Sequence, residues 1–145
     1  MFTPASARAA LNYRQTNVDG ASPYQLINLL FDGLLLSLRS ARASLARGDT
    51  QAKCDQLGKA VRFIEEGLKL GLDSQNGGEL AANLRNLYDY CVRRVTFANL
   101  RNEDAPIAEV IGLIESVAEG WRGIGGTVNT LNNSNAQRPA LAVGA

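Results

Sequence analysis

The sequence predicts an all-α protein: an antiparallel four-helix bundle with a short N-terminal helical cap segment and a disordered C-terminal tail. Three observations predict this fold. Apolar residues recur at intervals of three and four along four stretches, turn signals separate these stretches by short connections, and strand-like alternation of useful length does not occur. Helices with continuous apolar stripes and short connections bury those stripes most simply by packing antiparallel.

Length and composition indicate one soluble domain. The chain has 145 residues, of which 46% are apolar and 20% charged, with a net charge of +1. This balance argues against a nucleic-acid-binding protein. We expect one bundle domain over residues 1–128, with residues 1–21 as a mobile cap, and a flexible tail over 129–145. The first residues lack the apolar run of a secretory signal, which predicts a cytoplasmic location.

The first long helix has a well-defined start. Ser22 is a suitable N-cap, Pro23 suits the first turn, and Gln25 is placed to return a hydrogen bond to the cap. Its predicted core stripe contains Ile27, Leu30, Phe31, Leu34, Leu38, Ala41 and Leu45. Leu26, Leu29, Gly33 and Leu36 fall on roughly the opposite side. Polar interruptions make the apolar run too short for a membrane span, so no membrane insertion is expected.

The second helix follows a stop at Gly48 and a cap at Asp49. Its predicted core stripe contains Cys54, Leu57, Val61, Ile64, Leu68 and Leu72. Phe63, Gly67 and Leu70 lie on the other side, so this helix also has two apolar faces. Both cysteines of the chain, Cys54 and Cys91, are expected to be buried reduced thiols.

A turn cluster over residues 73–78 separates the second helix from the third. Glu79 lies in the first turn of the third helix, which ends over residues 99–102. The third core stripe contains Leu80, Leu84, Leu87, Tyr88, Cys91, Val95 and Ala98. Asp104 and Pro106 open the fourth helix. Its core stripe contains Ile107, Val110, Ile114, Val117, Trp121 and Ile124.

The two ends differ from the bundle. Residues 5–12 could form a short helix carrying Leu11 and Tyr13, but a helix of this length persists only when it docks on something. From Asn129 onward, polar and small residues dominate, and they bury too little apolar surface to offset the entropy of ordering.

The residue types present exclude several kinds of chemistry. The chain has no histidine, which removes histidine-based catalytic triads, the usual zinc ligands and the Glu-x-x-His pairs of di-iron bundles. The glycine pairs at 77–78 and 125–126 lack the lysine and strand of a phosphate loop. Asp32, within the apolar first helix, is expected to face water or an arginine. We therefore predict no catalytic residue, metal or cofactor.

The surplus apolar faces need a cover, which is more of this chain, a second copy or a partner. Two alternatives come from other classes: an enzyme or cofactor carrier built in the bundle core, and a regulator that binds nucleic acid or another protein through the basic face of the third helix. That basic face contains Arg85, Arg93, Arg94 and Arg101. A solvated face is the simpler interpretation of these arginines.

Several motifs, in this order and spacing, resemble the family of flagellin export chaperones called FliS. They are Met1-Phe2, Tyr13-Arg14-Gln15, Ala21-Ser22-Pro23-Tyr24-Gln25-Leu26-Ile27-Asn28-Leu29-Leu30-Phe31-Asp32-Gly33, Gly48-Asp49, Gly77-Gly78-Glu79-Leu80-Ala81-Ala82-Asn83-Leu84-Arg85-Asn86-Leu87-Tyr88-Asp89-Tyr90, Val92-Arg93-Arg94-Val95, Ala98-Asn99 and Trp121. The sequence departs from the family at Tyr24, where a histidine is common, and in a shorter link between Tyr13 and Ser22.

The resemblance implies a cytoplasmic, non-enzymatic chaperone. Such a protein holds the C-terminal segment of flagellin, prevents premature polymerisation and assists delivery to the flagellar type III export apparatus. The resemblance also implies contacts with the export gate and an anti-sigma regulator, and a monomer or weak homodimer. We predict that the flagellin groove and the N-terminal segment that competes for it contain Phe2, Leu11, Tyr13, Leu26, Leu29, Leu36, Phe63 and Leu70.

Overall fold

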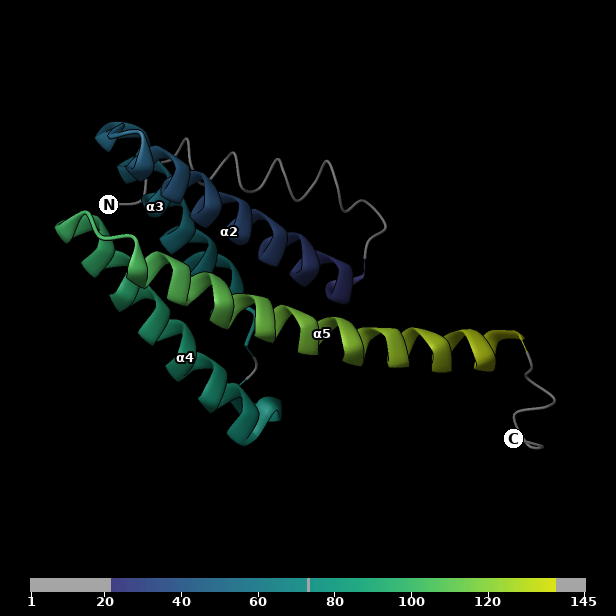
Figure 1. Cartoon of the computed structure of the whole chain (residues 1–145). Coiled ribbons are helices and arrows are strands. Elements are labelled where there is room, and N and C mark those ends of the chain that lie inside the picture. The colour runs from purple at the N-terminus through teal and green to yellow at the C-terminus, as the bar shows by residue number, and fades with distance from the viewer. Residues whose placement is uncertain (1–21, 73, 138–145) are drawn as a thin grey trace.

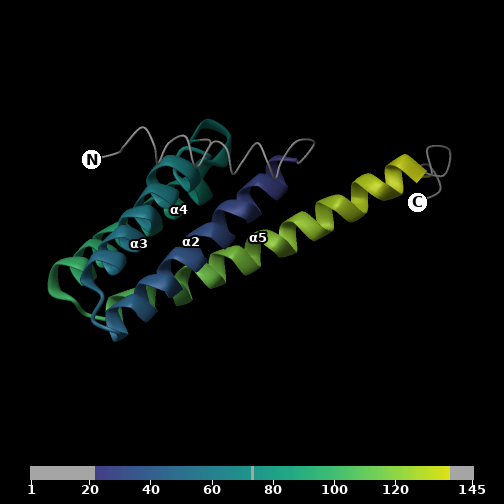
Figure 2. The same ribbon diagram turned by 90° about the horizontal axis from the view of Figure 1, so that it is seen from above.

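A computed structural model describes residues 22–72 and 74–137. The helices are α2 (Pro23–Ala46), α3 (Thr50–Phe63), the π-helical turn η1 (Ile64–Leu68), α4 (Ser74–Arg101) and α5 (Ala105–Gln137). The chain runs back and forth, so that each long helix is antiparallel to the next (Figures 1 and 2). α2 packs on α3 and α5, and α4 packs on the same two helices. The predicted all-α bundle is confirmed.

The predicted signals at both ends of α2 are confirmed. The Ser22 hydroxyl accepts a hydrogen bond from the Gln25 backbone N–H at 3.2 Å, and the Gln25 side chain accepts one from the Ser22 backbone N–H at 3.0 Å. This reciprocal pair satisfies two donors that a helix start leaves open. Gly48 takes a positive φ of 75°, and Asp49 caps α3 by accepting from the Ala52 N–H.

The second helical stretch contains a feature that its periodicity does not reveal. After Phe63 the backbone widens into η1, where the Lys69 N–H donates to the Ile64 carbonyl at 2.8 Å. A π-turn holds one more residue than an α-turn, and such turns are frequent at functional sites. Ile64 and Leu68 both remain buried, so the widened turn still contributes to the core.

Helix α4 begins with a kink. Gly78 has φ 56° and ψ −131°, values that interrupt the helix and suit glycine, and the regular helix follows it. The predicted start at Glu79 therefore agrees with the regular part of α4. At the other end Asn102, with φ 55°, turns the chain toward α5.

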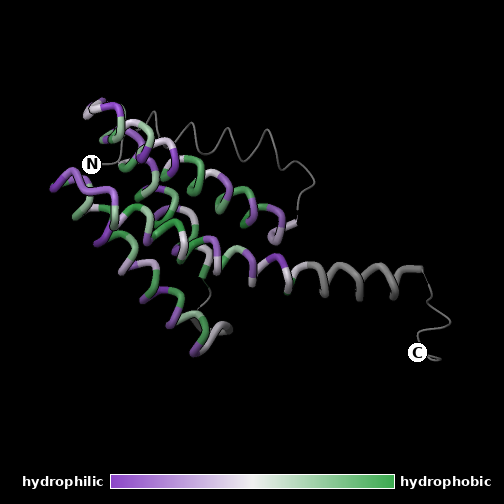
Figure 3. Tube along the Cα trace, viewed as in Figure 1, coloured by the Kyte–Doolittle hydropathy of each residue, from purple (hydrophilic) through white to green (hydrophobic). Residues whose placement is uncertain are grey.

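Most predicted core positions are buried, and apolar residues recur along every helix between polar ones (Figure 3). Two predicted core residues are wrong: Leu80 is 62% exposed and Ile124 is 57% exposed. Leu80 belongs to the first part of α4 and Ile124 to the second half of α5. α4 and α5 diverge from each other toward the start of α4 and the end of α5 (Figures 1 and 2). Because the helices separate there, each residue lacks the neighbour that a closed bundle would supply.

The ends of the chain leave part of the prediction open. α5 stays helical to Gln137, past residue 129 where the sequence predicted the tail to begin, and its end extends beyond the other helices (Figure 1). Once a helix is anchored by packing, each added turn needs no new nucleation. Residues 1–21 and 138–145 lie outside the described residues, so the cap and the flexibility of the tail stay predictions.

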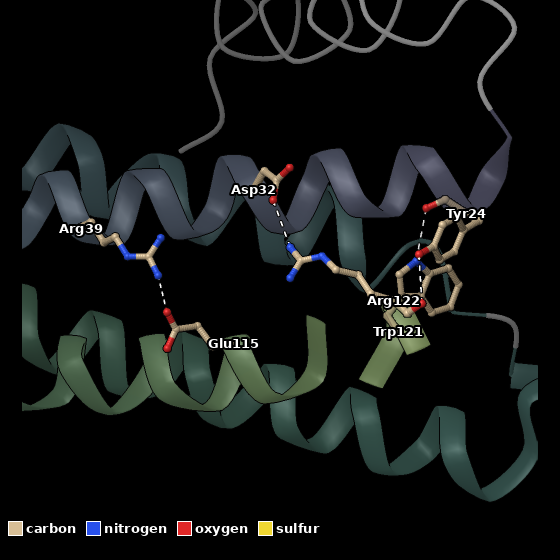
Figure 4. Close-up of polar contacts among 6 residues, drawn as sticks. All are labelled: Tyr24, Asp32, Arg39, Glu115, Trp121 and Arg122. Atoms are coloured by element: carbon tan, nitrogen blue, oxygen red, sulfur yellow. Dashed lines mark hydrogen bonds and ion pairs between the residues drawn. The ribbon is translucent and has the colours of Figure 1, made fainter. Parts of the chain in front are cut away.

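Polar contacts fasten α5 to α2 along their length (Figure 4). Arg39 pairs with Glu115, and Asp32 pairs with Arg122 at 3.2 Å, so the expectation that Asp32 meets an arginine is confirmed. Near the start of α2, the rings of Tyr24 and Trp121 stack with centroids 5.6 Å apart. The Trp121 indole N–H also donates to the Tyr24 carbonyl at 3.2 Å.

Buried polar groups fix the opposite end of the bundle. Lys53 is only 1% exposed, and its ammonium donates to the Asn99 carbonyl at 2.9 Å and to the Asn102 side chain. These bonds tie the first turn of α3 to the last turn of α4, where carbonyls lack helical partners. Both cysteines are free thiols; Cys91 is buried and Cys54 half-buried.

Candidate peptide-binding surface

The second apolar stripe of α2 lies along its border with α3. Leu36 is 67% exposed, and Leu26 and Leu29 are half-buried. Gly33, in the same stripe, lies under the ring of Phe63 from α3, because a Cβ at Gly33 would stand 2.5 Å from the Phe63 Cζ atom. The stripe is therefore continuous with apolar residues of α3.

The α3 side of this border contributes Phe63 and Leu70. Phe63 is half-buried and also packs against the core, whereas Leu70, in the turn after η1, is 76% exposed. We call the set Leu26, Leu29, Leu36, Phe63 and Leu70 the α2–α3 surface. It contains the five predicted groove residues that the structure describes; Phe2, Leu11 and Tyr13 lie outside the described residues.

Two further glycine contacts set the register of the α2–α3 surface. A Cβ at Gly67 would lie 3.1 Å from a Leu30 methyl, and one at Gly71 would lie 3.4 Å from the Ile27 Cδ1 atom. Leu70, next to Gly71, therefore lies level with Ile27 of α2. Leu36 follows Ile27 by nine residues on α2, a rise of about 13 Å along the helix axis. The two most exposed leucines of the α2–α3 surface, Leu36 and Leu70, thus mark a strip about two and a half turns long.

Charged groups line the α3 edge of the surface. The Lys69 ammonium pairs with Asp89 at 2.6 Å and with Glu65 at 2.8 Å, and these hydrogen bonds raise the pKa of Lys69. Burial raises the pKa of Glu66, against the opposing charge of Arg62. Glu66 is half-buried and stands three residues after Phe63 and four before Leu70. This spacing places a carboxylate on the helix face of those two apolar residues.

This arrangement can bind a segment of polypeptide by apolar contact. Within residues 22–72 and 74–137 the structure shows no group of three His, Cys, Asp or Glu side chains that could hold a metal ion. Among the described helices, none combines the length with the apolar character that a membrane crossing requires.

Sequence reasoning missed two kinds of exposed apolar residue. Periodicity predicts Leu80 and Ile124 in the core, and only the divergence of α4 and α5 reveals their exposure. Leu100, which is 78% exposed, was not singled out. Its spacing from Arg93 and Phe97 places it on their helix face, and this signal could have found it.

Comparisons with known proteins match most of the chain. Residues 5–128 match the family described as "Flagellar protein FliS". The chain is 47% identical to the flagellar secretion chaperone FliS of Salmonella typhimurium, over 86% of this chain and 93% of that relative. It is 39% identical to the flagellar secretion chaperone FliSB of Pseudomonas aeruginosa (81% and 95% covered) and 38% identical to the flagellar secretion chaperone FliS of Escherichia coli (81% and 89% covered).

Proposed function

The chain belongs to the FliS family of flagellar secretion chaperones, and we propose that it binds the C-terminal segment of flagellin on the α2–α3 surface. It is a chaperone rather than an enzyme. In this role it acts in the cytoplasm, prevents premature polymerisation of flagellin and assists its delivery to the flagellar type III export apparatus.

The observation that carries the proposal is the exposure of Leu36 and Leu70, together with the half-buried Leu26, Leu29 and Phe63, on two packed helices. A disordered segment that folds on binding loses entropy, so its chaperone needs several apolar anchor points. Two leucines about 13 Å apart would contact residues about nine positions apart on a helical client. Apolar residues at i, i+4 and i+8 of the client share one face and cover about this distance.

The energy available is sufficient. Burying one leucine side chain is worth about 1.5 to 3 kcal/mol. The exposed areas of Leu36 and Leu70, with the remaining parts of Leu26, Leu29 and Phe63, offer several kcal/mol before the ordering of the client is subtracted.

Calorimetry with a peptide of the flagellin C-terminal segment tests the proposal. Leu36→Glu and Leu70→Glu should each weaken binding by about tenfold or more, because a charge replaces an apolar anchor. The matched control is Leu100→Glu on α4, since Leu100 is as exposed as Leu70. Circular dichroism should show unchanged helicity for all three variants. Equal effects of the three substitutions, or none, would reject the α2–α3 surface.

The other expected partners rest on the family resemblance alone. We propose that the N-terminal segment with Phe2, Leu11 and Tyr13 competes with flagellin for the α2–α3 surface. We also propose contacts with the export gate and an anti-sigma regulator, and a monomer or weak homodimer in solution. No described residue is assigned to those contacts.

A further inference from the structure

The outer face of α4 combines exposed apolar residues with arginines. Tyr90, Arg93, Arg94, Phe97, Leu100 and Arg101 recur at intervals of three and four. At about 100° per residue they fall within about a third of a turn, on the side away from the buried residues of α4. We call these six residues the α4 patch.

The side chains of the patch are organised around Phe97, which is 37% exposed. The guanidinium of Arg94 lies 5.4 Å from the centre of the Phe97 ring, and that of Arg101 lies 5.5 Å from it. Such cation–π contacts hold arginine heads beside an apolar surface. Leu100, 78% exposed, extends that apolar surface toward the end of the helix.

The positive charge of the patch is only partly neutralised. Arg94 pairs with Glu109 of α5 at 2.7 Å, and the Tyr90 hydroxyl donates to the same carboxylate. Among the described residues Arg101 contacts Phe97 without forming an ion pair, and Arg93 lies 5.9 Å from the Tyr90 ring centre. The pKa of Asp89, one turn earlier on α4, is lowered by its hydrogen bond to Lys69 and also by the charge of Arg93, so Arg93 is partly neutralised within the chain. The Arg101 guanidinium is therefore the one most available to a carboxylate of a partner.

The two ends of this chain do not complement that charge. Residues 1–21 contain two arginines and one aspartate, and residues 138–145 contain one arginine and no acidic side chain. A nucleic acid is a poorer match, because the Glu109 carboxylate of α5 contacts two residues of the patch and the chain as a whole carries only +1. The composition of the patch fits an acidic segment with apolar anchors.

We infer that the α4 patch is a docking surface for an acidic amphipathic segment of a second protein. Carboxylates of that segment would bind Arg101 and Arg93, and its apolar residues would cover Phe97 and Leu100. The α4 patch shares no residue with the α2–α3 surface, and it lies on the side of α4 away from the buried residues that pack on the rest of the bundle. The second protein could therefore bind while a client occupies the α2–α3 surface.

The test uses the full chain and labelled synthetic peptides in fluorescence anisotropy. One panel has amphipathic helices of about five turns with leucine and phenylalanine on one face and glutamate elsewhere. A matched panel has lysine in place of every glutamate. We expect saturable binding of the acidic panel, at least about tenfold tighter than that of the lysine panel. The loss of a single charged hydrogen bond between an arginine and a glutamate already changes an affinity by about tenfold.

Variants locate the binding on the protein. Arg101→Glu should weaken the acidic peptides by about tenfold, and Leu100→Ser should weaken them by several-fold. Leu70→Ser, an equally exposed leucine outside the α4 patch, should leave their affinity unchanged. Excess flagellin peptide should not displace them. Thermal melts of the variants would show that the bundle stays folded.

Four results would overturn the inference. They are equal affinity for the two panels, insensitivity to Arg101→Glu, tighter binding of a short DNA duplex than of the acidic peptides, and self-association that Arg101→Glu abolishes. The last result would assign the α4 patch to a second copy of the chain. None of the four bears on binding of flagellin to the α2–α3 surface, so the two proposals fail separately.

Discussion

Gly125 on α5 holds the start of α2 in place, and replacing it with alanine tests this packing. Gly125 is buried beneath the ring of Tyr24: a Cβ built there would lie 1.6 Å from the Tyr24 Cε1 atom and 2.0 Å from Cζ. Tyr24 is held on other sides as well. Its ring stacks on Trp121, and its hydroxyl donates to the Arg122 carbonyl at 3.2 Å. Gly125→Ala must therefore displace the whole ring.

The magnitude follows from what the displaced ring loses. Stacking on Trp121 is worth about 1 kcal/mol, partial burial of the ring about 1 kcal/mol, and the hydroxyl hydrogen bond about 1 kcal/mol. Alanine regains about 0.8 to 1 kcal/mol over glycine within a helix. We expect a net loss of about 2 kcal/mol, which lowers the melting temperature of a chain of this length by about 7 °C.

Far-UV circular dichroism during urea and thermal unfolding measures this change. The control is Gly120→Ala on the same helix, where nothing lies within 4 Å of the added Cβ. It should raise stability by about 0.5 to 1 kcal/mol through helix propensity alone. In a Tyr24→Ala background, Gly125→Ala should change sign and stabilise. A Gly125→Ala protein as stable as Gly120→Ala, or one that Tyr24→Ala does not rescue, would refute the reasoning.

Three further predictions concern the core and the N-terminal segment. Lys53→Met should lower the free energy of unfolding in urea by about 2 kcal/mol, because charged hydrogen bonds are lost, whereas the exposed Lys59→Met should change it by less than about 0.5 kcal/mol. Burial raises the pKa of Cys91 from 9.0 to about 11 and that of Tyr88 from 10.0 to about 12. The unfolded chain therefore loses these two protons at a lower pH than the folded chain, so the free energy of unfolding should fall as the pH rises from about 9 to about 12. The fall should be less steep in Tyr88→Phe, and a flat profile would contradict this reasoning. Leu11→Ser in the full chain should tighten binding of the flagellin peptide in calorimetry, since a competitor is weakened; weaker binding would argue against a competing cap.

Caps and turns were predictable because each is specified by a few neighbouring residues. Ser22 with Gln25, Gly48 and Asp49 all act where the sequence placed them. The π-turn η1 could not be predicted, because two apolar residues four positions apart, such as Ile64 and Leu68, are equally compatible with an α-helical and a π-helical turn. Its presence depends on how the turn packs against the rest of the bundle.

The sequence could predict which residues lie on the candidate surface, but not how exposed each of them is. Helical periodicity placed Leu36 and Leu70 away from the core, and both are exposed. The same reasoning treated Phe63 alike, yet its ring is half-buried over Gly33. Leu80 and Ile124 failed in the opposite sense, because periodicity describes one helix and exposure depends on how far its neighbours diverge.

The glycines of α2, η1 and the following turn connect the packing of the bundle to its apolar surface. Gly33 is covered by Phe63 from the opposite helix, Gly67 by Leu30 and Gly71 by Ile27. Each large side chain thus lies on bare backbone, so the border between α2 and α3 closes without help from Leu36 or Leu70. Because the core is complete without them, the client binding that we propose for those leucines would not require the bundle to open. A chaperone that must load and release its client repeatedly needs this separation between the residues that hold its fold and those that hold the client.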